Sequence, residues 1–302
     1  MPHLWRKLVS VPAYLTAYRR GDDVMEPQTQ TWDVGEFRFT LDIAGPDSGD
    51  PVLLLHGFPQ NRRMWRHQLS VLADAGFRAL APDQRGYSAG ARPDRVEAYA
   101  TDLLMGDALA MMDGWGVRRF HLAGHDWGGQ LAWLIAAANP DRVATLSVLS
   151  RPHPAAFARA LAEDPEQANR SQHNRGFRQP EAVDRLRKDN FKSLRIGLER
   201  EGISDPDIYL NTLGEPGALQ AAINWYRASD VALSAIPAVT MPTLYVWGTN
   251  DASVGRRAAE LTREFVLGPY KFVELEAGGH FILDQMPDRV AQLVVAHLQS
   301  TK

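Results

Sequence analysis

The stretch FHLAGHDWGGQLAWLIAAANP, residues 120–140, decides how this chain folds. Its first residues are typical of a buried strand, and the residues that follow have the length and apolar pattern of a helix. The Gly-His-Asp-Trp-Gly-Gly run between them matches a sharp turn that exposes one side chain, here Asp126, above a sheet. Gly124, Gly128 and Gly129 fit such a turn, because strained backbone and close helix-strand contact leave little room for side chains.

Asp126 has a second interpretation, because strand-helix junctions often carry an Asp whose carboxylate caps the first turn of the helix. The turn alone does not separate this structural role from a catalytic one. A catalytic role requires partners from elsewhere in the chain.

Strand and helix patterns alternate along the chain. This βαβ rhythm predicts the α/β class with a mostly parallel sheet, preceded by a hairpin formed by TWDV and FRFTLDI. The expected strands are 31–34, 37–43, 51–57, 77–83, 120–126, 143–150, 243–248 and 270–277, and the expected helices are 62–74, 99–115, 128–140, 256–266 and 287–299.

The strand signal disappears after Ser150 and returns at TLYVWG, which begins at Thr243. The segment between them is polar, rich in arginine and helical in pattern, with RPHP at its start. The predicted parts of the chain are an N-terminal arm (1–30), a core domain (31–151 and 238–302) and an inserted helical cap (152–237).

The composition is that of an ordinary globular protein. Hydrophobic residues make up 45% and charged residues 23% of the 302 positions, and the net charge of −3 gives no basic excess that would attract nucleic acid. The absence of cysteine excludes disulfides, thiolate nucleophiles and Cys-ligated zinc. The sequence has no cluster of His and carboxylate ligands, so we expect neither a metal nor an organic cofactor.

The apolar run in residues 1–20 is interrupted by Arg6, Lys7 and Pro12. It is too short and too charged for a secretion signal or a membrane span, so we expect a cytoplasmic protein without stable membrane association. Apolar residues at helical spacing from Leu4 to Tyr18 leave open a surface helix or an arm packed on a neighbour, as in a homodimer.

Two further polar residues follow strands. Asp251 comes after the strand TLYVWG, and His280 comes after the last strand, in EAGGHF. Because the carboxyl ends of parallel strands form the ligand-binding edge of such sheets, we expect both residues beside Asp126. Nucleophile, acid and histidine also occur in the order expected for this type of fold. Singly, each residue would pass for an ordinary loop residue.

The His-Gly-Phe-Pro turn at 56–59 ends another buried strand and supplies a candidate oxyanion hole. We assign its two donors to the backbone N–H groups of Phe58 and Trp127. An aspartate is already ionised near neutral pH and attacks a carbon that bears a leaving group, giving an alkyl ester. Water activated by His280, which Asp251 orients, would hydrolyse that ester. Ordinary ester hydrolysis is disfavoured, since its acyl adduct would be an anhydride.

The motifs HGFPQNRRMW, DQRGYS, GHDWGG, VWGTND and GGHF resemble the epoxide hydrolases of the α/β-hydrolase fold and, more distantly, haloalkane and fluoroacetate dehalogenases. The resemblance covers nearly the whole chain after residue 30. It implies an eight-stranded, mostly parallel sheet with helices on both faces and an inserted helical cap. The expected substrate is a small epoxide, which water converts to a vicinal diol.

The cap segment INWYRA resembles the element whose tyrosine hydrogen-bonds the epoxide oxygen in that family, which assigns this role to Tyr226. The family usually has a second cap tyrosine, and the matching position here is His173. An imidazole can donate a hydrogen bond to the same oxygen. Tyr209 is the other candidate for this role, although DPDIYLNT does not match. The expected substrate contacts are Pro59, Trp127, Tyr209 and Trp225.

Dehalogenation is the alternative reaction, because Trp127 could donate its indole N–H to a halide. Fluoroacetate dehalogenases typically have arginine in place of Trp127, and haloalkane dehalogenases usually have Asn in place of Phe58. A binding protein that keeps the fold without turnover is a further alternative, which the intact Asp126, Asp251 and His280 disfavour.

Overall fold

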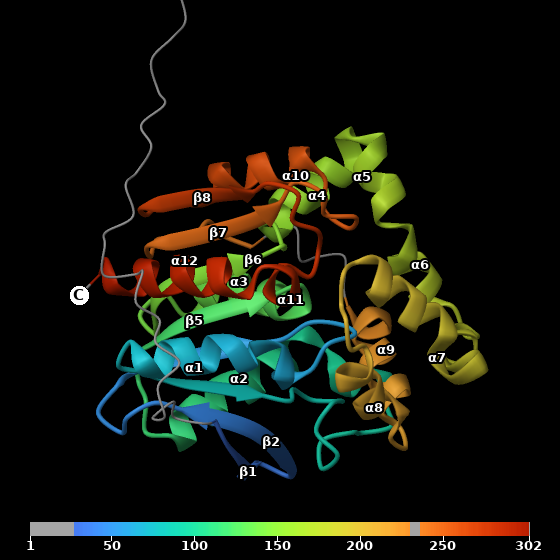
Figure 1. Ribbon diagram of the computed structural model, residues 1–302, viewed down its shortest axis with the longest axis horizontal. Helices are drawn as coiled ribbons and strands as arrows, with labels where there is room; N and C mark the ends of the chain where they lie inside the picture. Colours follow the sequence, from blue (N-terminus) through green and yellow to red (C-terminus); the bar gives the residue numbers. More distant parts are fainter. Residues whose placement is uncertain (1–26, 230–235, 302) are drawn as a thin grey trace, which may run out of the picture.

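The computed structural model describes residues 27–229 and 236–301. Their framework is one eight-stranded sheet with the strand order β1-β2-β4-β3-β5-β6-β7-β8 (Figure 1). The strands are β1 (Gln28–Val34), β2 (Phe37–Ala44), β3 (Asp50–Leu55), β4 (Phe77–Pro82), β5 (Phe120–His125), β6 (Val143–Leu149), β7 (Thr243–Gly248) and β8 (Tyr270–Leu275).

The strand pairing confirms the predicted sheet. β1 and β2 form the antiparallel hairpin, β2 pairs antiparallel with β4, and β3 to β8 are joined by parallel pairs only. β5 lies in the middle and is buried along its whole length, as expected for a strand covered on both faces. β1 begins at Gln28, so the last residues of the sequence-predicted arm pair with β2.

Helices cover both faces of the sheet, with α1 and α12 on the near face in Figure 1 and α2 and α3 on the far one. The helices of this part are η2 (Arg62–Trp65), α1 (Arg66–Asp74), η3 (Val96–Tyr99), α2 (Thr101–Gly114), α3 (Trp127–Ala138), α10 (Arg256–Leu261), η5 (Thr262–Phe265), α11 (Ile282–Gln285) and α12 (Pro287–Gln299). The helix expected over 256–266 tightens into η5, where the Thr262 hydroxyl donates to the Ala258 carbonyl at 3.2 Å.

Six helices lie between β6 and β7, beyond the carboxyl ends of the strands (Figure 1). They are α4 (Pro154–Glu163), α5 (Pro165–Arg170), α6 (Gln172–Arg178), α7 (Ala182–Arg200), α8 (Asp207–Gly214) and α9 (Ala218–Ala228). α7 is broken over residues 188–191, where the backbone is not helical. The Asn61 amide fastens α8 to the core by donating to the Ile208 carbonyl at 3.0 Å.

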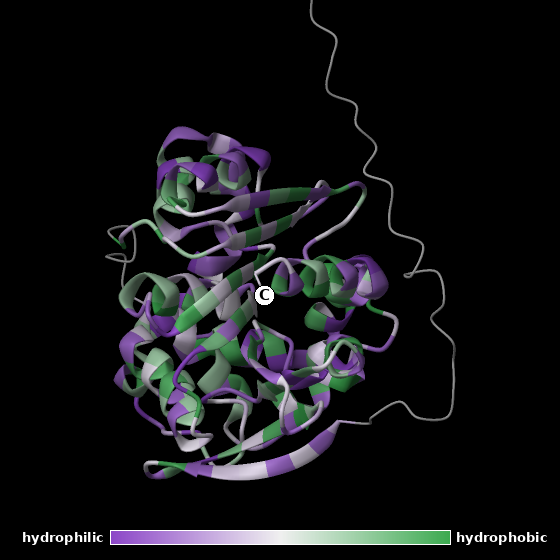
Figure 2. Ribbon diagram, turned by 90° about the vertical axis from the view of Figure 1, so that its left-hand side faces the viewer, coloured by the Kyte–Doolittle hydropathy of each residue, from purple (hydrophilic) through white to green (hydrophobic). Residues whose placement is uncertain are grey.

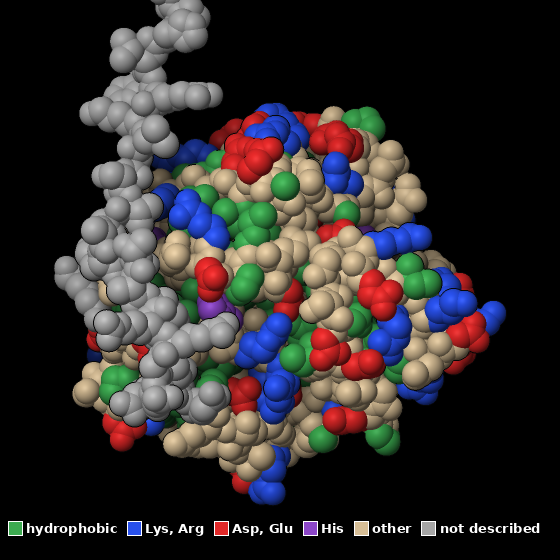
Figure 3. Space-filling model, viewed as in Figure 1, with side chains coloured by type: hydrophobic (Ala, Val, Ile, Leu, Met, Phe, Trp, Pro, Cys, Tyr) green, Lys and Arg blue, Asp and Glu red, His purple; other side chains and the backbone are tan. Residues whose placement is uncertain are grey.

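One continuous hydrophobic core joins the sheet, its helices and the inner faces of α4 and of α6 to α9. Figure 2 shows hydrophobic residues gathered on the inner strands and hydrophilic ones on the outer surfaces of the helices. Acidic and basic side chains are interspersed on the face shown in Figure 3.

No helix of the described residues is long and apolar enough to cross a membrane. The cytoplasmic location stays a prediction. Residues 1–26 lie outside the described part of the chain, so the surface helix and the homodimer also stay predictions.

Candidate active site

The turn between β5 and α3 aims Asp126 away from the helix that it precedes. Asp126 has φ +51° and ψ −118°, a conformation that L-residues rarely adopt, and its side chain makes no capping hydrogen bond. The capping interpretation is therefore wrong. A Cβ atom on Gly124 would lie 2.2 Å from the Gly128 carbonyl oxygen, so this close turn requires glycine.

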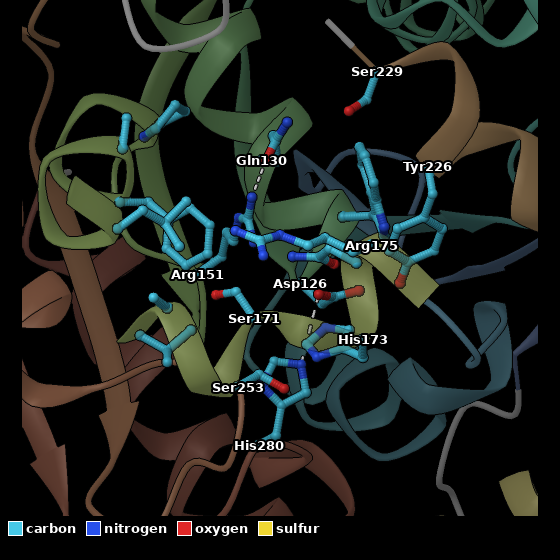
Figure 4. Close-up of a pocket in the computed structure, with 18 of the residues that line it drawn as sticks. Asp126, Gln130, Arg151, Ser171, His173, Arg175, Tyr226, Ser229, Ser253 and His280 are labelled. Carbon is cyan, nitrogen blue, oxygen red and sulfur yellow. Dashed lines mark hydrogen bonds and ion pairs between the residues drawn. The ribbon is translucent and has the colours of Figure 1, made fainter. Parts of the chain in front are cut away.

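Three strand ends bring Asp126, Asp251 and His280 together (Figure 4 shows Asp126 and His280). The His280 Nδ1 atom lies 3.0 Å from each carboxylate oxygen of Asp251, and its Nε2 atom lies 3.6 Å from Asp126 Oδ2. The Asp251 carboxylate accepts hydrogen bonds but cannot donate them, so the Nδ1 atom of His280 carries a proton. The Nε2 atom faces Asp126. Asp251 is fully buried and also accepts the backbone N–H groups of Ser253 and Val254.

These groups shift the pKa values of one another. Burial alone would lower the pKa of His280, but the charges of Asp251 and Asp126 and its hydrogen bonds to both raise it to about 10. Burial alone would raise the pKa of Asp126, but the hydrogen bond and charge of His280 hold it well below its ordinary value. At neutral pH the pair is therefore a carboxylate beside an imidazolium.

The Phe58 N–H, one of the two expected oxyanion donors, points at Asp126 and donates to its Oδ1 atom at 3.0 Å. Oδ2 is then the carboxylate oxygen on the His280 side. Trp127 opens α3, and the first N–H groups of a helix have no acceptor within the helix. Its donor role stays a prediction. Pro59 lines the cavity that Asp126 faces.

Tyr226 and His173 face Asp126 from the cap, on α9 and α6 (Figure 4). Both line the two cavities that open above Asp126. The Tyr226 ring packs edge-on against Trp127, with 5.0 Å between centroids. Burial raises the pKa of Tyr226 well above its ordinary value, and the Asp126 charge adds to the rise, while the Trp127 side chain and Arg151 partly offset it. Tyr226 therefore keeps its proton at every physiological pH.

A hydrogen bond to the Arg170 carbonyl determines which ring nitrogen of His173 carries the proton. Its Nδ1 atom lies 2.9 Å from the Arg170 carbonyl oxygen, which can only accept, so Nδ1 carries the proton in the neutral ring. Burial lowers the pKa of His173. Near neutral pH its Nε2 atom is therefore an acceptor, and His173 donates through Nε2 only when it is protonated. The role of His173 as a second donor stays a prediction, and in this geometry it requires the protonated ring.

Tyr209 and Trp225 lie away from the cavities, so the expected substrate contacts at these positions are corrected. The Tyr209 hydroxyl donates to the Asp284 carboxylate at 2.7 Å, and the Trp225 indole N–H donates to the Arg85 carbonyl at 2.8 Å. Both side chains are almost fully buried. They fasten α8 and α9 to the core, because a buried hydroxyl or indole N–H needs an acceptor.

Sequence reasoning missed three residues around the site. Glu201, which directly follows α7, lines one cavity and accepts the His280 backbone N–H at 3.2 Å. His125 donates from Nε2 to the His280 carbonyl at 2.8 Å, and Arg151 lines the other cavity. No sequence signal marked Glu201, and His125 and Arg151 were identifiable only as neighbours of the turn and of the cap. The described residues contain no cluster of His, Asp and Glu that could hold a metal ion.

Comparisons with known proteins agree with this fold. The model of the alpha/beta hydrolase fold family matches residues 50–287. The chain is 35% identical over 274 residues to epoxide hydrolase 4 of Mus musculus, covering 85% of this chain and 75% of that protein. It is 31% identical over 317 residues to epoxide hydrolase A of Mycobacterium tuberculosis, covering 90% of this chain and 97% of that protein.

A solved structure is similar over almost its whole length. It is described as one of the novel epoxide hydrolases of the alpha/beta hydrolases superfamily found in metagenomes from hot environments. It superposes with a TM-score of 0.82 at 31% identity, covering 90% of this chain and 98% of that one.

Proposed function

Since this chain belongs to the α/β-hydrolase-fold family, we propose that it is an epoxide hydrolase, which adds water to an epoxide and releases a vicinal diol. One observation carries the proposal. A carboxylate, Asp126, has an imidazole behind it and the Tyr226 hydroxyl across the same cavity. In this proposal residues 31–151 and 238–302 are the catalytic core, and residues 152–237 are the cap that covers the substrate.

In the first step, Asp126 Oδ2 attacks a ring carbon of the epoxide, and the bond from that carbon to the ring oxygen breaks. The Phe58 N–H holds the other carboxylate oxygen, Oδ1, which leaves Oδ2 as the attacking atom. The departing oxygen becomes an alkoxide and takes the proton of Tyr226. The products are an alkyl ester of Asp126 and a tyrosinate.

Alkylation then prepares His280 to act as a base. The ester has no negative charge, so the Asp126 contributions that raise the pKa of His280 disappear. The imidazolium becomes a stronger acid, and its Nε2 proton returns to the Tyr226 oxygen through the cavity. His280 is now neutral, with Nδ1–H held by Asp251 and a lone pair on Nε2.

In the second step, Nε2 of His280 removes a proton from water, and the water oxygen attacks Cγ of Asp126. Negative charge develops on Oδ1, next to the N–H groups of Phe58 and Trp127. The bond between Cγ and the ester oxygen breaks, and the leaving alkoxide takes the second proton of the attacking water from the new Asp126 carboxyl group. The diol leaves, and the charged pair of Asp126 carboxylate and His280 imidazolium is restored. One oxygen of Asp126 now comes from water, so the atoms and protons of the cycle balance.

An isotope experiment tests this route. In a single turnover in H₂¹⁸O, we expect the label in the Asp126 peptide and not in the diol, by mass spectrometry of both. Asp126→Ala should abolish turnover, because nothing else supplies the bond-forming atom. Label in the first-turnover diol would mean that water attacks the epoxide directly, which contradicts the ester mechanism. Faster halide release from haloalkanes than opening of any epoxide would favour dehalogenation.

A further inference from the structure

Two cavities meet above Asp126, with volumes of about 320 and 250 Å³. Five residues line both of them: Asp126, His173, Tyr226, Ser253 and His280. We call the larger cavity the arginine arm, because Arg151, Arg175 and Arg178 line it. We call the smaller one the apolar arm, because Phe58, Pro59, Phe177, Leu194, Leu198 and Phe281 line it. An epoxide held above Asp126 can therefore extend one substituent into each arm.

Arg151 is the innermost of the three arginines. It follows Ser150, whose φ of +53° turns the chain at the end of β6. Its guanidinium donates to the Gln130 side-chain oxygen, a neutral acceptor, and lies 4.4 Å from the centre of the Phe157 ring (Figure 4 shows Gln130 and Arg151). Its Nε atom is buried without a hydrogen-bond partner, and among the described residues it forms no ion pair with a carboxylate.

A partly buried arginine without an acid is unusual, because a guanidinium that loses contact with water is normally paired with a carboxylate. Elsewhere on the cap, Arg170 pairs with Glu166 and Arg195 pairs with Asp207 at 2.7 Å. Burial lowers the pKa of Arg151, and the negative charge of Asp126 offsets part of this decrease. That carboxylate becomes a neutral ester during the proposed cycle, so Arg151 then has no counter-charge from Asp126.

Arg175 and Arg178 of α6 extend the positive charge along the same arm. Arg178 donates to the Ser229 hydroxyl at 3.1 Å, and within residues 27–229 and 236–301 neither arginine is paired with an acid. Among the residues that line the arginine arm, Asp126 is the single carboxylate. The rest of the lining is mixed: it contains the polar side chains of Gln130, Ser171, Asn174 and Ser229 and the apolar side chains of Trp127, Pro154, Phe157, Ala158, Leu161, Ala168 and Val254.

The apolar arm has the opposite character. Its charged lining residue apart from Asp126 and the histidines is Glu201, a carboxylate that would repel an anion. Its rings and aliphatic side chains suit a hydrocarbon substituent. The two arms therefore differ in the sign of the charged side chains that line them, arginines in one and Glu201 in the other.

We propose that the substrate is an epoxide with a carboxylate on one side and an apolar group on the other, the carboxylate being bound in the arginine arm by Arg151 with Arg175 and Arg178. This inference rests on the proposed epoxide hydrolase function and names its substrate class. Guanidinium groups bind carboxylates through paired, charge-assisted hydrogen bonds, which also orient the substrate. The positive charge near Asp126 reduces the repulsion between the attacking carboxylate and an anionic substrate.

The probe is 3-phenylglycidate, an epoxide with a phenyl group on one carbon and a carboxylate on the other, compared with the neutral 3-phenylglycidamide. Further pairs of acid and amide, in which a longer spacer separates the epoxide from the carboxylate or amide, extend the series. For the best-accepted spacer we expect kcat/KM to favour the acid over its amide about tenfold to hundredfold, mostly through KM. Arg151→Met should remove most of that preference, and Arg175→Met a smaller part. Arg195→Met, outside both cavities, is the matched control and should keep it.

The outcomes separate the two proposals. No epoxide turnover by the wild type, acid or amide, would overturn the epoxide hydrolase function. Turnover with equal kcat/KM for acid and amide at every spacer length would overturn the carboxylate site alone. If Arg151→Met slows acid and amide equally, Arg151 supports the turn or the charge of Asp126 rather than the substrate, and the carboxylate site is again refuted.

Discussion

The core half and the cap half of the site hold their side chains in different ways. In the core half, Asp126, Asp251 and His280 are fixed by hydrogen bonds to one another and to backbone N–H groups. In the cap half, the Tyr226 ring is fixed by aromatic packing, with centroid distances of 4.9 Å to Phe177, 5.5 Å to Phe58 and 5.0 Å to Trp127. The core half is therefore preorganised for charge, and the cap half presents the neutral hydroxyl of Tyr226 to the substrate.

This difference predicts that damage to the two halves blocks different steps. Core variants should stop the cycle at the ester or before it, whereas cap variants should slow ring opening and leave ester hydrolysis intact.

The largest effect among the variants that still form the ester is expected for His280→Gln. Alkylation needs no base, whereas hydrolysis needs an activated water, so steady-state turnover should fall on the order of 10³-fold while the ester accumulates. Rapid quench and mass spectrometry of the Asp126 peptide measure both. Asp126→Asn is the control that should form no ester. A variant that binds the epoxide but never forms the ester would contradict this division of roles.

Tyr226→Phe removes the proton donor and keeps the packed ring. We expect ester formation from a neutral epoxide to slow about 10²-fold, because the alkoxide then leaves without a proton. Single-turnover kinetics measure this step, and the rate of ester decay is the internal control that should change little. A wild-type rate of ring opening in this variant would refute the role of Tyr226.

The lowered pKa of His173 predicts that the rate of ring opening depends on pH. Its pKa is lowered, so the ring is neutral near pH 7 and gains its Nε2 proton only as the pH falls through that lowered value. Asp126, with a lowered pKa, stays ionised over this range, and His280, with a raised pKa, stays protonated. The single-turnover rate of ester formation should therefore rise on mild acidification.

His173→Tyr supplies a donor that does not depend on pH. If one hydrogen bond contributes about 1 kcal/mol, the rate of ester formation near neutral pH should rise about fivefold. His173→Gln, which also lacks a titratable proton, should lose the acid-side increase. An unchanged pH profile in His173→Gln would assign that increase to another group.

The smallest effect on rate is expected for Tyr209→Phe, because Tyr209 joins α8 to Asp284 rather than contacting the cavity. We expect the rate of epoxide turnover to change less than about twofold. The free energy of unfolding should fall by about 1 to 2 kcal/mol, since the buried Asp284 carboxylate loses a donor. Chemical denaturation and steady-state kinetics measure the two quantities. A large loss of turnover with an unchanged free energy of unfolding would indicate that Tyr209 contacts the substrate.

The core half could be predicted because its residues stand at strand ends. Parallel strands bring their carboxyl ends to one edge of the sheet whatever lies between them in sequence. Asp126, Asp251 and His280 therefore had to meet there once the strands had been recognised. The Phe58 N–H followed in the same way, because the end of β3 lies beside the end of β5.

The cap half could be predicted only in part. Tyr226 was identified through a resemblance to a known family, and not through its spacing. Tyr209 and Trp225 also lie on cap helices and are chemically similar, yet both face the core. Local sequence does not separate these cases, because the direction of a side chain on a short helix depends on how that helix docks.

The sequence by itself determined the sheet, the turn that carries Asp126 and the order of the three core residues, because hydrophobic periodicity and glycine placement are local properties of the chain. Only the tertiary structure decided which cap side chains reach the cavity and which nitrogen of His173 carries the proton. It also brought Arg151 beside Asp126 without an acid of its own. These features depend on contacts between segments that lie far apart in the sequence. A local sequence pattern does not specify the distances between such segments or which atom of a hydrogen-bonded pair carries the proton.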